Sequence, residues 1–541
     1  MEKLIGSRTE LTANERDYLE AIAKRWQDFA KQMESTAGSR VFEADGHTRV
    51  AELWLKLGRR VEASQEFRKA RDLYIKLVEY APGLVESRPR LATTHEALAL
   101  VLADLTGLEE SKESSAELQA AMKLRQQLVE QFPDKLEYQK GLIASYHNRA
   151  MIHARKGRDE PARLDFSEAR KLLQKLSDRD PKDESILHYR AAIHLSMGQF
   201  QRSVVNYPEA KIELTTARDI YRKLWEQNPN EREEQFFLAL AHSFLGAIHR
   251  HLWEWKAGQV ELDAARDILQ RLADQFPAVP MYRVNLARAT NGLGILYLRI
   301  GQMEKSRAAY QSTLEIRQKL VADFPNVVDY QIELAGSYCN KGELISKGGA
   351  LAESLPWFGD AERMLVPIHT ADPNNATAKE FLRNVSFHRA KVLNALKKYP
   401  ESLRDWDRTI ELTRPEKRWE YCLNRVEVRY SCGLLDEAVE DIASFEKKAT
   451  LRPEFWFTFG SICAEAADKY PEKNVEYADR AMALLTKAVN GGYKDSFRLN
   501  LSPKLKALRS REDFKALVQK VGGKPTPKSD TETAPPPRES K

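Results

Sequence analysis

A proline that recurs at a fixed interval is the feature that most limits how this chain can fold. Consecutive members of the series are 48 residues apart: Pro133, Pro181, Pro229, Pro277, Pro325 and Pro373. Proline lacks an amide donor and disfavours helical geometry in the residue before it, so each is expected to end a helix. The fixed interval predicts one structural unit repeated along the chain, and not a set of unrelated globular domains.

The residues ahead of each proline carry the pattern of one helix face. Twelve residues before it stand Ala121, Ala169, Ala217, Ala265, Thr313 and Ala361. Nine residues before it stand Leu124, Leu172, Ile220, Ile268, Ile316 and Met364. Five residues before it stand Leu128, Leu176, Leu224, Leu272, Leu320 and Ile368. These offsets follow one stripe of an amphipathic helix, and the small residue allows a neighbouring helix to come close.

A second column of small residues follows each proline and predicts a second helix in every unit. Seventeen residues after it stand Ala150, Gly198, Gly246, Gly294, Gly342 and Ala390. Glycine inside a helix costs about 1 kcal/mol relative to alanine, so a column of such residues indicates close helix contact. Each unit is therefore predicted to be two helices, with Gly157, Gly301 and Gly349 near the turn between them.

This arrangement resembles the tetratricopeptide repeat, which follows W-x2-L-G-x2-Y, then A-x3-F, then P over 34 residues. The stretch TNGLGILY carries Leu293, Gly294 and Tyr297, with Thr290 in the place of the tryptophan. Two steps within the unit are each seven residues longer than in the family, and this nearly two-turn extension turns the apolar stripe by only ~20°. The resemblance implies an all-α, right-handed alpha-alpha superhelix, a solenoid with elongated 48-residue repeats.

The spacing changes toward the ends and predicts five segments. Residues 1–47 are expected to form an N-terminal helix and linker, and residues 48–373 an array of long helical hairpins. Residues 374–490 are predicted to hold shorter repeats of ordinary spacing, and residues 491–522 to form C-terminal capping helices. Residues 523–541 have the composition of a disordered tail.

A narrower resemblance covers the chain from Leu11 to Val521. Four stretches are similar to the repeat region of planctomycete-type serine/threonine protein kinases: LTANERDYLEAIAKRWQDFA, IRQKLVADFPNVVDY, YPESLRDWDRTIEL and, most specifically, YADRAMALLTKAVNGGYKDSFRLNLSPKLKALRSREDFKALVQKV. In that family a kinase domain precedes the repeats. This sequence has no glycine-rich loop, no H-R-D-x-x-x-x-N and no D-F-G, so kinase activity is not expected of it.

Composition and charge argue against several classes of partner and compartment. The 85 basic and 79 acidic residues nearly cancel to a net charge of +6 without a basic block, so no nucleic-acid partner is expected. No run of 18 apolar residues and no secretory h-region occurs, so no membrane partner is expected. The four cysteines form no C-x-x-C pair, which favours a reducing compartment, and a cytoplasmic location is predicted.

No catalytic residue, cofactor site or metal site is predicted, and the chain is not expected to be an enzyme. His242 and His249 share a helix face, with His251 nearby, but they occupy packing columns, and no further zinc ligand follows at close spacing. Cys422 and Cys432 have no histidine base in an evident relation to them, so we expect unreactive thiols.

Two sets of residues are candidates for partner binding. Asn148, Asn291 and Asn340 lie within one residue of the same point in the first helices, beside the small column. Asparagine is unfavourable inside a helix unless its amide is used. In the tetratricopeptide family the first helices line the concave groove, where asparagine amides commonly hold a peptide backbone. The alternatives are a solvated helix face or a hydrogen bond between helices.

Trp253 and Trp255, in HLWEWKAG, are predicted to lie where two long helices turn. They are either an exposed contact for a partner or a cap on the hairpin. The predicted function is a non-catalytic scaffold that binds a protein or peptide segment in the solenoid groove. The alternative is the regulatory or sensor repeat region of a serine/threonine kinase whose catalytic domain is absent from this chain. The sequence predicts no oligomeric state.

Overall fold

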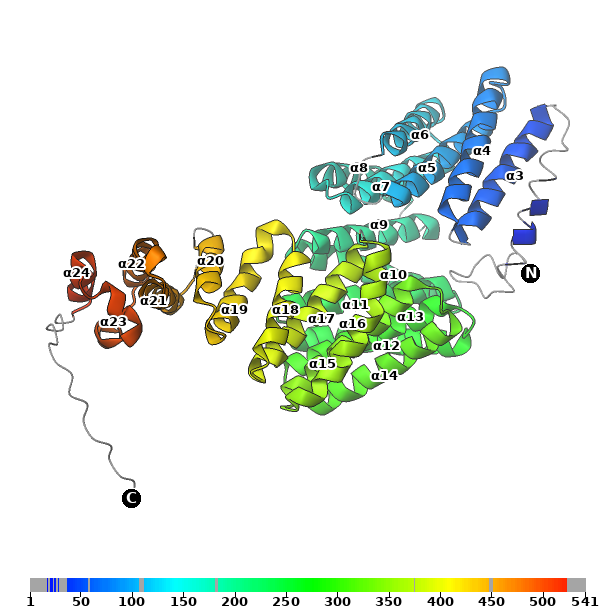
Figure 1. The fold of residues 1–541 in the computed structure, drawn as a ribbon. Coiled ribbons are helices and arrows are strands. Elements are labelled where there is room, and N and C mark those ends of the chain that lie inside the picture. The colour runs from blue at the N-terminus through cyan, green and yellow to red at the C-terminus, as the bar shows by residue number, and fades with distance from the viewer. Residues whose placement is uncertain are drawn as a thin grey trace, which may run out of the picture. The chain divides into compact units, whose positions relative to one another are not determined.

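The computed structural model describes residues 37–56, 59–106, 111–180, 183–373, 375–446 and 451–522, with a few isolated positions between 17 and 28. These residues form helices and no strand (Figure 1). The tail 523–541, Pro181 and most of residues 1–36 lie outside the described part of the chain. The chain divides into two compact units, residues 1–344 and residues 345–541.

Unit 1 is a succession of long helices. They are α3 (Ala37–Lys56), α4 (Arg60–Tyr80), α5 (Ser87–Thr106), α6 (Lys112–Gln131), α7 (Leu136–Arg155), α8 (Asp159–Arg179), α9 (Glu184–Ser203), α10 (Tyr207–Gln227), α11 (Arg232–His251), α12 (Trp255–Gln275), α13 (Pro280–Arg299), α14 (Met303–Asp323) and α15 (Val328–Lys347), whose last turn passes the boundary. From α7 onward each first helix has 20 residues and each second helix 21. The 48-residue period of the sequence is thus the period of the helices.

The second helices end where the prolines predict. α10, α12 and α14 each stop two residues before Pro229, Pro277 and Pro325, respectively. The alanine and threonine column twelve residues before the prolines is fully buried throughout, with 0% of each side chain exposed. The structure therefore confirms the predicted apolar stripe on these helices.

The array begins earlier than residue 48. α3 starts at Ala37, fourteen residues before the small residue Ala51, just as α7 starts at Leu136, fourteen residues before Ala150. A long first helix needs about four turns ahead of the small residue, so it extends into residues 1–47, the predicted N-terminal helix and linker.

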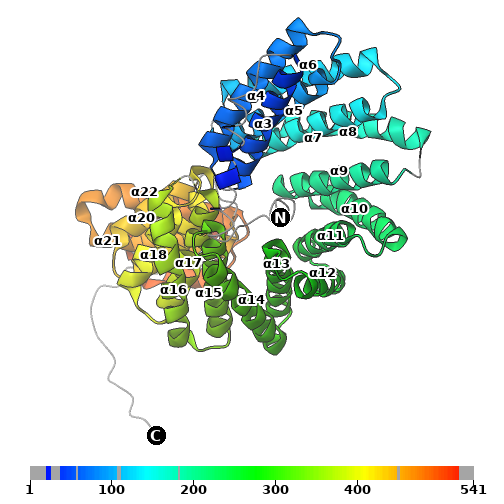
Figure 2. The same ribbon diagram turned by 90° about the vertical axis from the view of Figure 1, so that its right-hand side faces the viewer.

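The helices of unit 1 pack in sequence order. From α3 to α14 each helix contacts the next one, and α11 also contacts α9 and α13, which are the first helices of the neighbouring pairs. Figure 2 shows α9, α11 and α13 on the inner side of the curve of this unit, with α10 and α12 on the outer side. First helices therefore line one face of unit 1, and second helices line the other.

The second small column is the point of closest approach within each pair. A Cβ on Gly246 would lie 2.5 Å from Cγ of Leu262, and a Cβ on Gly294 would lie 2.5 Å from Cδ1 of Tyr310. The residues sixteen positions after the small column are buried, and most of them are bulky: Phe166, Leu214, Leu262, Tyr310, Phe358 and Trp406. The prediction that the glycines allow close helix contact is confirmed.

The turn between the two helices of a pair also repeats, with one residue in the left-handed region. Gly157, Gly301 and Gly349 have φ values of 68°, 78° and 91°. At the equivalent positions 205, 253 and 397 the chain has Val, Trp and Lys with φ of 62°, 62° and 60°. The predicted turn glycines are confirmed. A non-glycine residue in this region costs about 1–2 kcal/mol.

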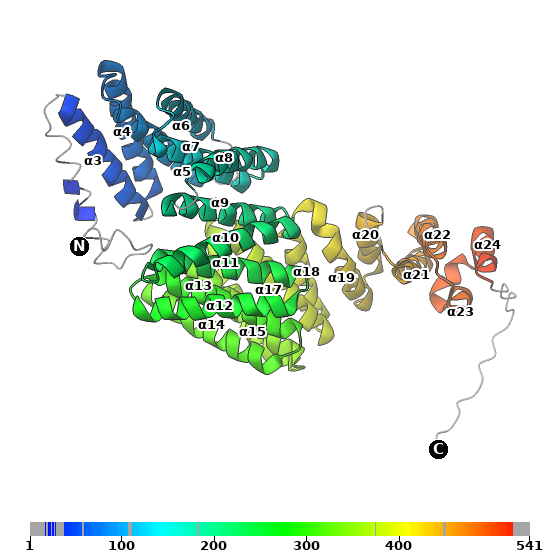
Figure 3. The ribbon, with the colours of Figure 1, turned by 180° about the vertical axis from the view of Figure 1, so that it is seen from behind.

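Unit 2 has shorter helices toward its end. They are α16 (Leu351–Ala371), α17 (Ala376–Ala395), α18 (Tyr399–Glu411), α19 (Arg418–Ser431), α20 (Leu435–Phe445), α21 (Pro453–Lys469), α22 (Asn474–Asn490), α23 (Ser496–Leu501) and α24 (Glu512–Lys520), with short 3-10 helices η1 (Pro415–Lys417), η2 (Pro471–Lys473) and η3 (Pro503–Leu508). Figure 3 shows α23 and α24 beside α21 and α22. Leu505, Leu508 and Phe514 of this last segment are buried in one core with residues of α21 and α22.

The structure confirms the predicted fold class, an all-α solenoid of the tetratricopeptide type with elongated repeats. Within the described residues, no helix combines the length and apolar character that a crossing of the bilayer needs.

Replacing Gly294 with alanine is expected to destabilise the protein by about 1–3 kcal/mol, because the new Cβ would overlap the Tyr310 ring. Gly359→Ala in α16 is the control, since nothing lies within 4 Å of a Cβ there and alanine should stabilise the helix by about 1 kcal/mol. Urea unfolding followed by circular dichroism measures both changes. Equal stabilisation by the two substitutions would contradict the packing role of the glycine column.

Candidate functional site

The candidate site is a groove of about 390 Å³ on the first-helix face of unit 1. Its walls come from α11, α13 and α15, with further residues from α9 and α14. The residues around it are Gln199, Phe236, Leu240, Phe244, Met281, Val284, Asn285, Ala287, Arg288, Arg317, Leu320, Asp329, Tyr330 and Glu333. A cavity of this size lies in the range that holds small ligands or a few side chains of a partner.

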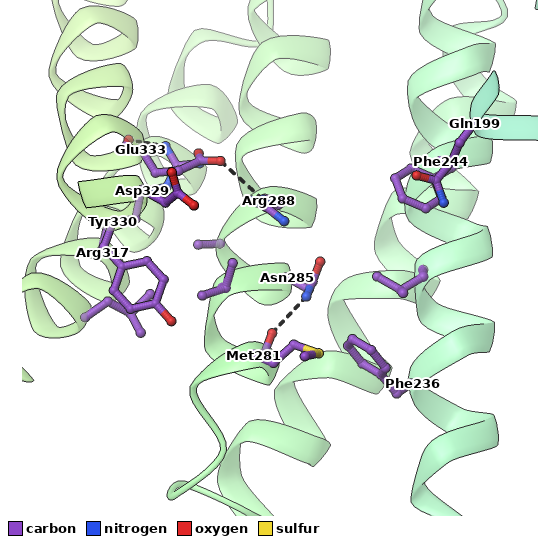
Figure 4. Close-up of a pocket in the computed structure, with 14 residues that line it drawn as sticks. Gln199, Phe236, Phe244, Met281, Asn285, Arg288, Arg317, Asp329, Tyr330 and Glu333 are labelled. Atoms are coloured by element: carbon purple, nitrogen blue, oxygen red, sulfur yellow. Dashed lines mark hydrogen bonds and ion pairs between the residues drawn. The ribbon is translucent and has the colours of Figure 1, made fainter. Parts of the chain in front are cut away.

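One wall of the groove is apolar. Phe236, Leu240 and Phe244 follow one another at intervals of four residues on α11, so they lie on one face of that helix. Phe236 also packs against Tyr282 of α13, with ring centroids 5.5 Å apart. Figure 4 shows Phe236 and Phe244 on one helix and Met281 on the helix beside it. Apolar side chains of a ligand can therefore be buried between α11 and α13.

The opposite wall is polar. Asn285 donates from Nδ2 to the carbonyl oxygen of Met281 at 2.9 Å, which leaves its Oδ1 as an acceptor. Arg288 donates from Nε to Oε1 of Glu333 at 3.2 Å (Figure 4). The groove thus offers an amide acceptor and an ion pair opposite its aromatic wall, the combination of apolar contact and oriented polar groups typical of binding sites.

A buried arginine fixes the position of Glu333. Arg317 is 4% exposed, and its Nη1 donates to the carbonyl oxygen of Glu333 at 2.7 Å and to Oγ of Ser337 at 2.8 Å. Its Nη2 also donates to the Glu333 carboxylate at 2.5 Å. Burial lowers the pKa of Arg317, while Glu333 raises it. Since these bonds tie α14 to α15, the α15 wall of the groove is held in a defined place.

None of these groove residues is predicted from the sequence. The signal that could have found them is the segment 235–244, QFFLALAHSF, which is apolar on more than the one stripe that a helix in this array must bury. Phe236, Leu238 and Ala239 are buried in the core, while Leu240 and Phe244 remain half-buried at the groove.

The structure brings two of the three candidate asparagines together. Asn340 donates from Nδ2 to Oδ1 of Asn291 at 2.8 Å, across two neighbouring first helices. Asn148 lies on α7 beside His147, whose pKa is lowered by burial. All three are half-buried, and none belongs to the lining of the 390 Å³ groove. The hydrogen bond leaves both amide hydrogens of Asn291, and one amide hydrogen and the carbonyl oxygen of Asn340, for further contacts.

Trp253 and Trp255 have different surroundings at the α11–α12 turn. Trp253 occupies the left-handed turn position and is 75% exposed. Trp255 opens α12, is half-buried, and packs on the cluster that contains Leu262 and Leu293. The two rings meet edge to face, with centroids 5.3 Å apart. Trp255 therefore covers the end of the hairpin, and Trp253 projects from it.

The candidate histidines face glutamates and not one another. His242 Nδ1 lies 2.5 Å from Oε2 of Glu261, and His249 Nδ1 lies 2.5 Å from Oε2 of Glu254. His251 stacks on Tyr207 with ring centroids 4.6 Å apart. The histidine columns thus join the two helices of a pair through carboxylates.

The Glu261 pair is one of a recurring set of polar triads. Arg218 of the preceding second helix reaches the same carboxylate, with Nη1 2.6 Å from Oε1. Glu213 is placed in the same way between His194 and Arg170, and Glu117 between His95 and Arg71. Each triad ties one helix pair to the next, which gives these buried charges a structural role.

The thiols named from the sequence are poor nucleophiles in the structure. Cys422 is 5% exposed and Cys432 is half-buried, and burial raises the pKa of both. Burial also raises the pKa of Cys463, to about 12. A protonated, enclosed thiol reacts slowly, so these cysteines act as small apolar residues.

Comparison with known proteins gives likeness of fold only. No protein-family model matches the chain, and no curated protein matches it. Among solved structures it is similar to BtubC (BKLC) from P. vanneervenii, at 16% identity over 48% of this chain and 90% of that one, with a TM-score of 0.39. It is also similar to apo RapI, at 13% identity over 74% and 98%, with a TM-score of 0.39.

A tetratricopeptide repeat protein from Parabacteroides merdae is similar at 16% identity over 62% of this chain and 99% of that one, with a TM-score of 0.29. These structures are similar to this chain only at low sequence identity and with low TM-scores. None of them assigns this chain a partner or an activity.

Replacing Glu261 with glutamine is expected to reduce the free energy of unfolding by about 1–3 kcal/mol near neutral pH. Burial raises the pKa of the Glu261 carboxyl, but His242 and Arg218 together lower it below its ordinary value of 4.5. The ionised form therefore stabilises the fold above about pH 4.5, and this contribution is lost as the pH falls through the lowered pKa.

Urea unfolding of the two proteins over a pH series measures this difference, which should shrink in acid. Glu226→Gln is the matched control, because Glu226 is exposed on α10 and the substitution should change stability little at any pH. A difference of constant size across the series would contradict the charge-based role of Glu261.

Proposed function

We propose that this chain is a non-catalytic scaffold that binds a segment of a partner protein in the groove of unit 1. The observation that carries the proposal is the groove itself, whose aromatic α11 wall faces the polar residues of α13 and α15. It lies on the first-helix face and within the predicted array of long hairpins, residues 48–373. The free and mostly buried cysteines fit a reducing compartment, and we place the chain in the cytoplasm.

The groove suits a short peptide segment better than a large flat partner. Its apolar wall can bury one or two side chains of the segment against Phe244 and Met281, while the Oδ1 of Asn285 accepts a backbone amide hydrogen. The Arg288–Glu333 pair at the rim offers both signs of charge, which favours one orientation of a polar segment. Partner identity then depends on where the segment carries its apolar and charged groups.

The candidate residues from the sequence extend this proposed surface. Asn291 and Asn340 lie on the same helices as the groove, α13 and α15, and their remaining amide groups can contact the backbone of a longer segment. Trp253 is a large exposed ring held at a strained turn position, and we propose it as an additional contact. Asn148 on α7 would be reached only by a segment that continues along the first helices.

A second proposal rests on the resemblance of residues 477–521 and three other stretches to the repeat region of planctomycete-type kinases. In this alternative the chain is the regulatory or sensor part of a serine/threonine kinase whose catalytic domain is encoded elsewhere. The genomic sequence beside the coding region tests it. An adjoining frame with H-R-D-x-x-x-x-N and D-F-G would support the kinase alternative, and its absence would leave the scaffold proposal.

Replacing Val284 with glutamate is expected to weaken partner binding by at least about tenfold, because a larger, charged side chain would replace an apolar one in the groove. Val260→Glu is the matched control, since Val260 is 62% exposed on α12, a second helix. The partner captured by the unaltered chain is titrated against both variants. Equal affinity of the two variants would exclude this groove as the binding site.

Replacing Asn148, Asn291 and Asn340 together with alanine is expected to weaken partner binding with little change in thermal stability. Loss of the Asn291–Asn340 hydrogen bond costs about 1 kcal/mol, and alanine is the better helix former by roughly half a kcal/mol per site, so the two effects nearly cancel. Asn424→Ala on α19 is the control. Lower stability with unchanged binding would show that the amides only join the helices.

A further inference from the structure

Three arginines end three successive first helices of unit 1. Arg202 lies in the last turn of α9, Arg250 in that of α11 and Arg299 in that of α13. No guanidinium group of the three forms an ion pair or hydrogen bond with another side chain in the described ranges of the chain. Other arginines of this unit do find carboxylates, for example Arg218 with Glu261 and Arg283 with Asp323, each at 2.6 Å.

The three positive charges act on one another. Arg250 is half-buried, and its pKa is lowered first by burial and then by the charges of Arg299 and Arg202, while Tyr310 and Tyr207 raise it. The pKa of the neighbouring His251 is also lowered, by burial and by Arg250 and Arg202. Like charges gathered without a carboxylate repel one another, and a bound anion relieves this repulsion.

The helix dipole does not account for the cluster. A cation at a helix C-terminus gains about 0.3–1 kcal/mol, which explains one basic residue per helix, such as Arg155 on α7. It does not explain why Arg250 is half-buried between two further arginines, because desolvation and like charge both act against its ionised form.

A buried hydroxyl lies in the same neighbourhood. Tyr310 is 3% exposed, and its Oη has no hydrogen-bond partner within the described part of the chain. Burial and then Glu343 raise its pKa, while Arg250 and Arg299 lower it. Glu343 on α15 therefore contributes to the pKa of Tyr310, but it is not among the largest contributions to the pKa of Arg250. The cluster keeps an unmatched positive charge.

Arg202 adjoins one end of the groove. The Arg202 guanidinium carbon lies 5.7 Å from the centroid of the Phe244 ring, and Phe244 and Gln199 both line the groove. The acidic residues of the groove, Asp329 and Glu333, belong to its α15 wall. A segment in the groove would therefore meet uncompensated positive charge beside Phe244.

We propose that Arg202, Arg250 and Arg299 bind a phosphoryl group. A phosphoryl group carries about −1.5 to −2 charges and three strong acceptor oxygens at neutral pH, which match several guanidinium donors. A single carboxylate would neutralise one arginine and leave the others unmatched. Guanidinium groups also bind such oxyanions with two parallel hydrogen bonds. The assignment of this phosphoryl group to a segment in the groove rests on the proposed function. The anion site itself does not depend on that function.

Calorimetric titration of the full chain with inorganic phosphate, phenyl phosphate and acetate, at constant ionic strength, tests the proposal. Both phosphates should bind and acetate should not. Arg250→Gln should weaken phosphate binding by about tenfold or more, and so should Arg202→Gln, which alters an exposed residue and keeps the test valid if the first variant folds poorly. Arg271→Gln, at an exposed position of α12, is the matched control and should bind as the unaltered chain does.

The same titrations distinguish a phosphorylated segment from free phosphate as the source of the phosphoryl group. Tighter binding of phenyl phosphate than of inorganic phosphate, with the difference removed by Phe244→Leu, supports a phosphorylated segment in the groove. Equal affinities support free phosphate as the ligand of the site. Acetate binding as tightly as phosphate, no phosphate binding, or unchanged binding in both arginine variants would each overturn the proposal. Phosphate binding does not involve Val284. The Val284→Glu variant therefore tests partner binding in the groove independently of the phosphate site.

Discussion

The structure depends on one contact that recurs in long helix pairs of unit 1, a small residue of the first helix against a buried, bulky side chain of the second. Gly246 meets Leu262 and Gly294 meets Tyr310 at distances that no Cβ would permit. This close approach fixes the rotation of each first helix about its axis. Once that rotation is fixed, the same positions of successive first helices face the same side of unit 1, and a continuous binding face can form.

The long repeat supplies the surface on which the groove is built. The step from proline to the next small residue is seven longer than in the tetratricopeptide family, so each first helix gains nearly two turns at its start. Phe236, Val284, Asn285 and Glu333 all lie nine or ten residues before the small column, in those added turns. The groove therefore uses a part of the helices that ordinary repeats of this type do not have.

Charged residues have two separate roles in unit 1. Where a glutamate lies between a histidine and an arginine, as Glu261 does, the buried charges compensate one another and join neighbouring pairs. At the ends of α9, α11 and α13 the arginines have no such carboxylate among the residues that the structure describes. The positive charge at these helix ends is therefore not compensated in the way that the charges of the triads are.

The sequence by itself determined the period, the helix ends, the two small columns and the turn glycines, because each reflects a contact that every repeat makes in the same way. It also placed Asn291 and Asn340 at equivalent points of their helices. Only the tertiary structure decided that these two amides meet each other, that QFFLALAHSF forms a groove wall, and that Arg202, Arg250 and Arg299 gather without a carboxylate. The physical reason is that a site uses different side chains from helices 48 residues apart, and periodicity reports only what those helices have in common.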